Sequence, residues 1–72
     1  MSEEAKKVAF VAFCVEAYKT AKHIGGEEVS TLFAKYGVDS YLYEEYEILH
    51  TMGIDMVLDY INRFLEVRGA KI

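Results

Sequence analysis

The stretch Val8-Ala-Phe-Val-Ala-Phe-Cys-Val15 places eight apolar residues in succession within a chain of 72 residues. A run of this length is too short to cross a bilayer, which takes about 20 apolar residues. It is also too apolar for an ordinary surface helix, so the rest of the fold or a partner must bury it. We therefore expect this run to organise a small helical domain.

The length and the cysteine content limit how such a domain is stabilised. A chain of 72 residues forms one domain, residues 1–72, with a modest core. Its single cysteine closes no internal disulfide, and no Cys/His cluster has the spacing of a zinc site. Oligomerisation or a partner chain is the natural supplement, and we expect a monomer or a small homo-oligomer. The lone thiol and an N-terminus without a secretion pattern favour the cytoplasm.

Glycines divide the chain into four helical segments, since proline is absent and no strand-like alternation occurs. The segments cover about residues 3–22, 27–36, 39–51 and 54–67. Gly25-Gly26 should end the first and Gly37 the second, and Asp39 is a candidate N-cap of the third. The third segment has the least regular pattern, which allows a break near Glu44. The short connections predict an all-α fold, a compact bundle of four short helices around a central apolar N-terminal helix.

Each segment has an apolar face that we expect to point into the core. On the first segment these residues are Phe10, Phe13, Cys14, Ala17, Tyr18 and Ala21, flanked by Val11 and Val15. On the second they are Val29, Leu32, Phe33 and Tyr36, and on the third Leu42, Tyr46 and Leu49. On the fourth they are Ile54, Val57, Leu58, Ile61, Phe64 and Leu65.

The charges are distributed unevenly, although the net charge is only −4. Residues 36–62 contain six acidic side chains and no Lys or Arg. Phosphate contacts need cations, so this segment is unsuited to nucleic acid and would suit a basic partner protein. The alternative is a solvated face that aids solubility.

Three arrangements could carry chemistry, and none is convincing. Residues 32–49 resemble a helix-turn-helix, but the second helix offers tyrosines and glutamates where a DNA reader needs Arg, Lys, Asn or Gln. Glu47 and His50 have the spacing of a di-iron helix, but no second copy follows. Cys14 could pair with a histidine as a nucleophile, yet it lies on the apolar face, where a cysteine packs as a small hydrophobe. We expect no enzyme, no catalytic residue, no metal and no cofactor.

The tyrosines are the remaining clue to function. Four of the six lie within residues 36–46, among acidic residues, and tyrosine is enriched at protein interfaces. Some of them could equally cover the core with their hydroxyls in water. The predicted partner-binding residues are Tyr41, Tyr43, Glu44, Glu45, Glu47 and His50.

Five short stretches also resemble a known family. They are Phe10-Val-Ala-Phe-Cys-Val-Glu-Ala-Tyr18, Glu28-Val29, Leu32-Phe33, Tyr36-Gly-Val38 and Tyr46-Glu-x-Leu-His-Thr-x-Gly53. The family consists of short bacterial proteins catalogued as domain of unknown function 3791, and it has no established activity. Its genes often neighbour one for a protein that resembles ADP-ribosyltransferases. The resemblance therefore implies a binding or neutralising partner role in a two-gene unit, like that of an antitoxin.

The sequence thus predicts a non-enzymatic protein-interaction module that docks an acidic and aromatic surface onto a basic partner protein. A helix-turn-helix DNA-binding regulator is the first alternative. A self-assembling structural subunit is the second. No membrane association is expected.

Overall fold

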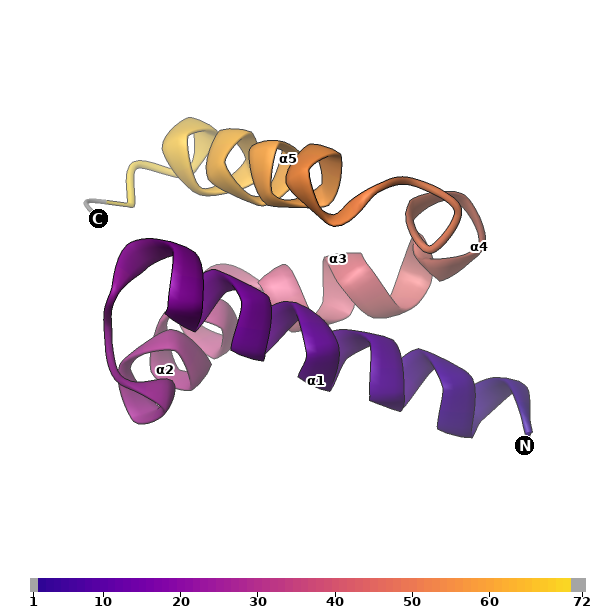
Figure 1. Cartoon of the computed structure of the whole chain (residues 1–72). Coiled ribbons are helices and arrows are strands. Elements are labelled where there is room, and N and C mark those ends of the chain that lie inside the picture. The colour runs from indigo at the N-terminus through magenta and orange to yellow at the C-terminus, as the bar shows by residue number, and fades with distance from the viewer. Residues whose placement is uncertain (1, 71–72) are drawn as a thin grey trace.

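The computed structural model describes residues 2–70 and, within them, five helices and no strand (Figure 1). The helices are α1 (Glu3–Lys22), α2 (Gly26–Tyr36), α3 (Val38–Glu44), α4 (Tyr46–Leu49) and α5 (Ile54–Val67). The predicted all-α class is confirmed, and a Cα radius of gyration of 11.4 Å matches the value of about 11 Å for a compact chain of this length. None of these helices is both long and apolar enough to cross a membrane.

Helix α1 begins at a side-chain cap and ends at a histidine. Ser2 Oγ accepts a hydrogen bond of 3.1 Å from the backbone N–H of Ala5, which satisfies one of the free donors of the first turn. The predicted end at residue 22 is confirmed, but Gly25-Gly26 does not stop the helix. His23 stops it in the left-handed conformation, with a φ of 55°. The two glycines instead begin α2, whose N-cap is Gly25.

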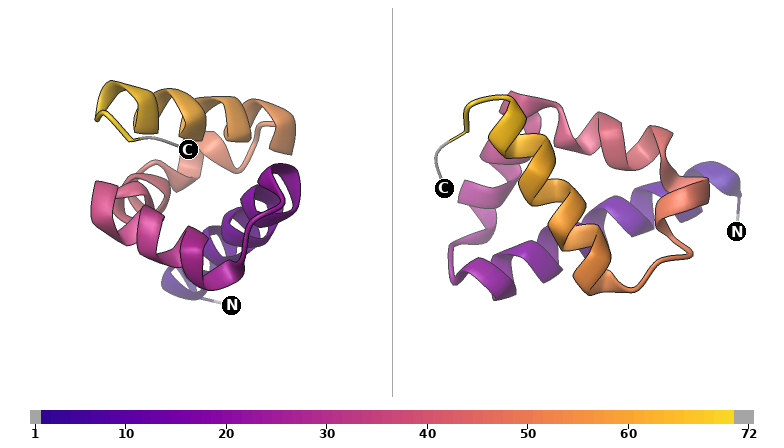
Figure 2. Two further views of the ribbon diagram at one scale, coloured as in Figure 1. Left: turned by 90° about the vertical axis from the view of Figure 1, so that its left-hand side faces the viewer. Right: turned by 90° about the horizontal axis from the view of Figure 1, so that it is seen from above.

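Helices α1 and α3 form the pair on which the rest of the chain packs. α2 and α5 each contact both of them, and α4 contacts α3. α5 and α2 lie on opposite sides of this pair (Figure 2). α1 has 20 residues and is the longest helix, so its first turns extend away from α2 and α5, beside the corner between α3 and α4 (Figure 1). Its neighbours therefore contact α1 without enclosing it.

The core draws residues from every helix. Its buried members are Cys14, Tyr18, Val29, Phe33, Val38, Leu42, Leu49, Val57, Ile61 and Leu65. Tyr18 and Phe33 meet edge to face with their ring centroids 5.2 Å apart, which joins α1 to α2. The predicted inward faces of α2 and α5 are confirmed, and Val38 is a core residue that the pattern did not predict.

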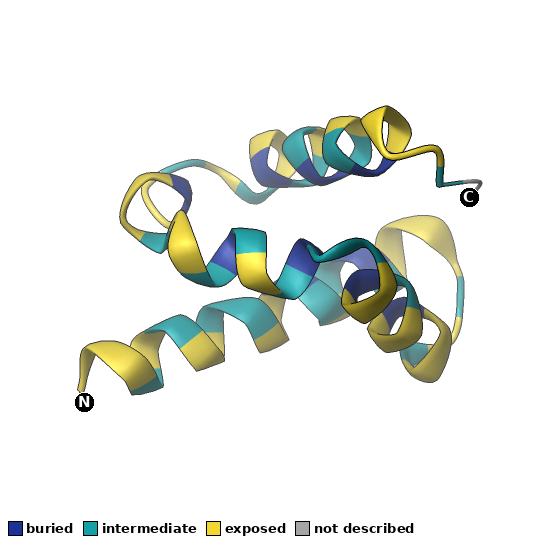
Figure 3. Ribbon diagram, turned by 180° about the vertical axis from the view of Figure 1, so that it is seen from behind, coloured by how far each residue is buried: buried dark blue, intermediate teal, exposed yellow. Residues whose placement is uncertain are grey.

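Two inward predictions on α1 were wrong. Phe13 is 55% exposed, and Ala21 is exposed as well. Each residue of an α-helix turns the next by about 100°, so Phe13 lies well to one side of its buried neighbour Cys14. Only Cys14 and Tyr18 of α1 are fully buried, and the first turns of the helix carry no buried residue (Figure 3).

The third predicted segment is two helices rather than one. Its break falls at Glu45, close to the predicted position near Glu44, and leaves α4 as a single turn. The prediction that Asp39 is the N-cap was wrong. α3 begins one residue earlier, because Val38 is buried in the core and Gly37 makes the turn with a φ of 77°. Asp39 therefore lies inside the first turn of α3.

Candidate functional site

The six predicted partner-binding residues do not share one surface. Tyr41 and Tyr43 flank the buried Leu42, and two residues along a helix correspond to a rotation of about 200°. Tyr41 points toward α5, where its ring stacks on Phe64 with centroids 4.5 Å apart. Tyr43 points toward α1, where Lys7 Nζ lies 5.2 Å from the centroid of its ring. α3 therefore separates the two tyrosines.

On the α5 side, Tyr41 lies in a polar hollow of about 410 Å³ that also contains Glu44 and Glu45. Burial raises the pKa of the Tyr41 phenol, and the charge of Glu45 and the neighbouring Tyr60 raise it further. The guanidinium of Arg68 lies in the same hollow, 3.4 Å from the Phe64 ring centroid. This hollow thus holds its own cation beside its acids, and Tyr41 helps to join α3 to α5.

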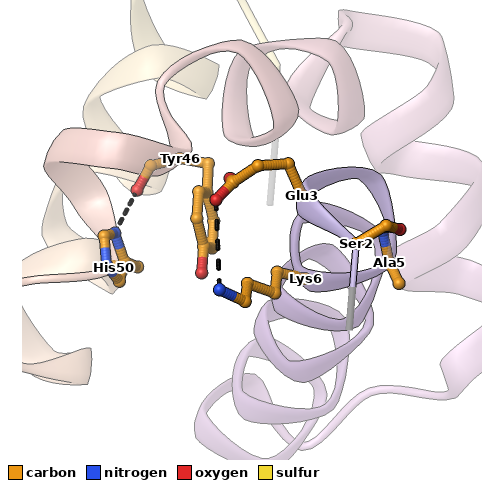
Figure 4. A network of polar contacts seen from close by, with 6 residues as sticks. All are labelled: Ser2, Glu3, Ala5, Lys6, Tyr46 and His50. Atoms are coloured by element: carbon orange, nitrogen blue, oxygen red, sulfur yellow. Dashed lines mark hydrogen bonds and ion pairs between the residues drawn. The ribbon is translucent and has the colours of Figure 1, made fainter.

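Glu47 and His50 lie on α4 and the turn that follows it. The His50 ring is parallel to that of Tyr46, with centroids 4.3 Å apart, and its Nδ1 lies 2.7 Å from the Tyr46 carbonyl oxygen, which accepts the hydrogen bond (Figure 4). His50 therefore helps to terminate the one-turn helix, whereas Glu47 is exposed. Within residues 2–70, no three His, Cys, Asp or Glu side chains are placed to hold a metal ion.

Cys14 is part of the core, as its place in the apolar run predicted. Burial raises the pKa of its thiol to about 11. A protonated thiol is a poor nucleophile, so its surroundings do not favour covalent chemistry.

A longer hollow, which we call the α1 groove, runs between α1 and the α2–α3 pair. One part, of about 570 Å³, is lined by Val8, Val11, Ala12, Val15, Glu16, Ser30, Asp39 and Tyr43. A second part, of about 540 Å³, is lined by Ser2, Glu4, Ala5, Val8, Ala9 and Tyr43. Val8 and Tyr43 line both parts, so the two parts adjoin each other. The α1 wall of the groove is mostly aliphatic.

The charges that line the α1 groove are all negative. They are Glu4, Glu16 and Asp39, and the cation beside them is Lys7, over the ring of Tyr43 at the edge of both parts. Lys19 pairs with Glu16 at 3.7 Å, but 44% of the Lys19 side chain and 69% of the Glu16 side chain are exposed to solvent, so the pair is weak. Asp39 is half-buried, and burial raises the pKa of its carboxyl. No cation within residues 2–70 forms an ion pair with Asp39.

The groove was not among the predicted sites, although the run at residues 8–15 held the signal for it. That run has apolar residues all round the helix, and the core uses only part of its circumference. Among the predicted site residues, only Tyr43 lines the groove.

The helix-turn-helix alternative gains no support from the structure. The helix that would read the bases is α3, which has no Lys or Arg and exposes Ser40 and Glu44.

The model of the family described as protein of unknown function (DUF3791) matches residues 9–68. No curated protein and no solved structure matches the chain.

Proposed function

The chain belongs to the DUF3791 family, whose description names no function. From the geometry of the chain we propose that it is a protein-interaction module. Its α1 groove docks an amphipathic helix of a partner protein. The observation that carries the proposal is the aliphatic wall of the groove. Val8 is 60% exposed there, next to Ala12 and Val15. An exposed apolar groove bordered by polar groups is the usual receptor for the apolar face of a helix.

The dimensions of the groove suit one helix of moderate length. Its α1 wall extends from Ala5 to Val15, which is about 15 Å at 1.5 Å per residue. A partner helix of about three turns covers that length. Ala5, Ala9 and Ala12 carry small side chains, so the backbone of a partner helix can approach closely.

The charges favour a different protein over a second copy of this chain. In a symmetric dimer that used the groove on both sides, Glu4, Glu16 and Asp39 would face the same acids of the partner copy. A helix with basic residues beside its apolar stripe has the complementary charge.

The proposed role needs no catalysis, and we place it in the cytoplasm. The first natural partner to test is a protein resembling ADP-ribosyltransferases, as the family resemblance implies, in an antitoxin-like unit. Tyr41, Glu44, Glu45, Glu47 and His50 lie outside the groove, and the docked helix of this proposal does not contact them.

The proposal is tested with a displayed library of amphipathic helices of about three to four turns, selected for binding to the whole chain. We expect the selected helices to lose binding to Val8→Glu, because the new charge lies in the apolar wall. They should keep full affinity for Val67→Glu, since Val67 is 82% exposed on α5 and does not line the groove.

Two results would overturn the proposal. One is a library that yields no binders above background. The other is a set of binders that tolerate Val8→Glu while circular dichroism shows the variant to be folded. If the variant unfolds, Ala12→Glu replaces it, since Ala12 is exposed and lines the same wall.

A further inference from the structure

Asp39 is the one half-buried carboxylate of the α1 groove. It follows Val38, a fully buried residue, at the start of α3 and faces the aliphatic wall of α1. Removing a carboxylate from water without a compensating partner costs free energy. Burial raises the pKa of Asp39, and no Lys or Arg within residues 2–70 forms an ion pair with its carboxylate.

The fold itself makes no use of the Asp39 side chain. Gly37 holds the N-cap position that the sequence suggested for Asp39, and no side-chain cap is formed there. Among residues 2–70, the side-chain hydrogen bonds and the ion pairs all involve other residues. A carboxylate inside the first turn of a helix gains something from the helix dipole, but α3 has seven residues and the gain is small.

Three other hollows of the molecule are also lined by acidic residues, but a cation of the chain lines each of them as well. The hollow between α3 and α5 contains Arg68 beside its glutamates. The hollow along α2, of about 650 Å³, contains Lys35 beside two glutamates. The hollow between α1 and α5, of about 330 Å³, contains Lys22 beside two aspartates. Each of the three is lined by a cation of this chain, whereas the α1 groove has Lys7 only beside it, over the Tyr43 ring, and that lysine forms no ion pair with Asp39.

We infer that Asp39 selects the partner by binding an arginine or lysine side chain of the docked helix. The inference rests on the proposed function and names the partner's chemistry. The partner helix places its apolar stripe on the α1 wall and one basic residue at the flank that faces α3. Arginine suits the position best, because its guanidinium binds a carboxylate through two parallel hydrogen bonds.

Tyr43 supports the same cation. It lies four residues after Asp39, one turn further along α3, and lines the same side of the groove. Lys7 Nζ lies 5.2 Å from the centroid of this ring, which shows that the ring is open to a cation, and an incoming guanidinium would take the place of that ammonium. A guanidinium held by Asp39 can stack on an aromatic ring placed in this way.

The test uses helices from the display library that depend on Val8. We expect their sequences to be enriched in Arg or Lys at one flank position. Asp39→Asn should weaken a synthetic peptide of this kind by about tenfold or more, since a tenfold change in affinity corresponds to about 1.4 kcal/mol. The matched control is Asp59→Asn, an exposed aspartate on α5 outside the groove, which should leave the affinity unchanged.

A double-mutant cycle then assigns the contact. Replacing the enriched Arg of the peptide by Gln should weaken binding to the wild-type chain as much as Asp39→Asn does. The two changes together should cause little further loss. If the double mutant loses affinity by the product of the two single losses, or if the groove binders show no preference for basic residues, the inference is overturned. The proposal that the groove docks a helix would not be affected by either result. A library without any Val8-dependent binder would overturn both.

Discussion

Replacing Phe13 and Phe33 by alanine in separate variants tests which side of α1 faces the core. Phe33 is fully buried and meets Tyr18 edge to face, so its truncation should cost about 3–5 kcal/mol of the free energy of unfolding. Phe13 is 55% exposed. Full burial of such a side chain contributes roughly 1.5–3 kcal/mol, and Phe13 gains less than half of that contribution. Its truncation should therefore lower the free energy of unfolding by about 1 kcal/mol.

The difference is large compared with the stability of so small a domain. At about 0.05–0.15 kcal/mol per residue, 72 residues give roughly 4–11 kcal/mol in total. Phe33→Ala should therefore remove much of the stability and Phe13→Ala little. Urea titrations followed by far-UV circular dichroism measure both changes, provided that the three proteins share one m-value. Equal losses for the two variants would refute the reasoning, because they would require Phe13 to be buried and α1 to be rotated about its axis.

Two further predictions concern Gly37 and Cys14. Gly37→Ala should lower the free energy of unfolding by about 1–2 kcal/mol through backbone strain alone, since φ is +77° and no atom lies within 4 Å of the added methyl group. The control is Gly53→Ala, because Gly53 has a φ of −66° and equally open space around it. Its free energy of unfolding should stay within about 1 kcal/mol of the wild-type value. Similar losses for both variants in urea titrations would contradict the strain argument. Burial raises the pKa of the Cys14 thiol from 9.0 to about 11, so a thiol reagent at neutral pH should label it only after denaturation. Because the folded-state pKa is the higher one, the thiol's contribution to stability is complete below pH 9 and is lost as the pH rises toward 11. The unfolding free energy of the wild type should then fall more steeply over that range than that of Cys14→Ala, and equal slopes would count against a buried thiol.

The sequence predicted the faces of α2 and α5 because each has one clear apolar stripe. Val29 and Phe33 on α2 follow that rule, and so do Val57 and Ile61 on α5. A helix with polar residues on one side has only one way to face a core. α1 lacks such a polar side over residues 8–15, so helical periodicity could not choose between its faces, and Phe13 was assigned to the wrong one.

The candidate site was harder to predict, since it depends on contacts between helices. That Tyr41 and Tyr43 lie on opposite flanks of α3 follows from helical geometry once Leu42 is assigned to the core. Which neighbour each tyrosine meets depends on how α3 packs between α1 and α5, and no local pattern encodes this. The same holds for Asp39, which local rules place at a helix start and the tertiary structure places against an aliphatic wall.

The apolar run of α1 and the acidic lining of its groove point to one kind of occupant. The core accounts for Cys14 and Tyr18, but it leaves Val8 and Ala12 exposed along the groove. A charged residue at position 8 or 12 would disturb no core contact, so the fold alone does not require an apolar residue there. A wholly apolar partner would cover that wall but leave Asp39 without a counter-charge. A wholly basic partner would supply the counter-charge but leave the wall without an apolar contact. The two features therefore have different roles in recognition. The α1 wall sets the affinity for any amphipathic helix, and Asp39 sets the specificity among such helices.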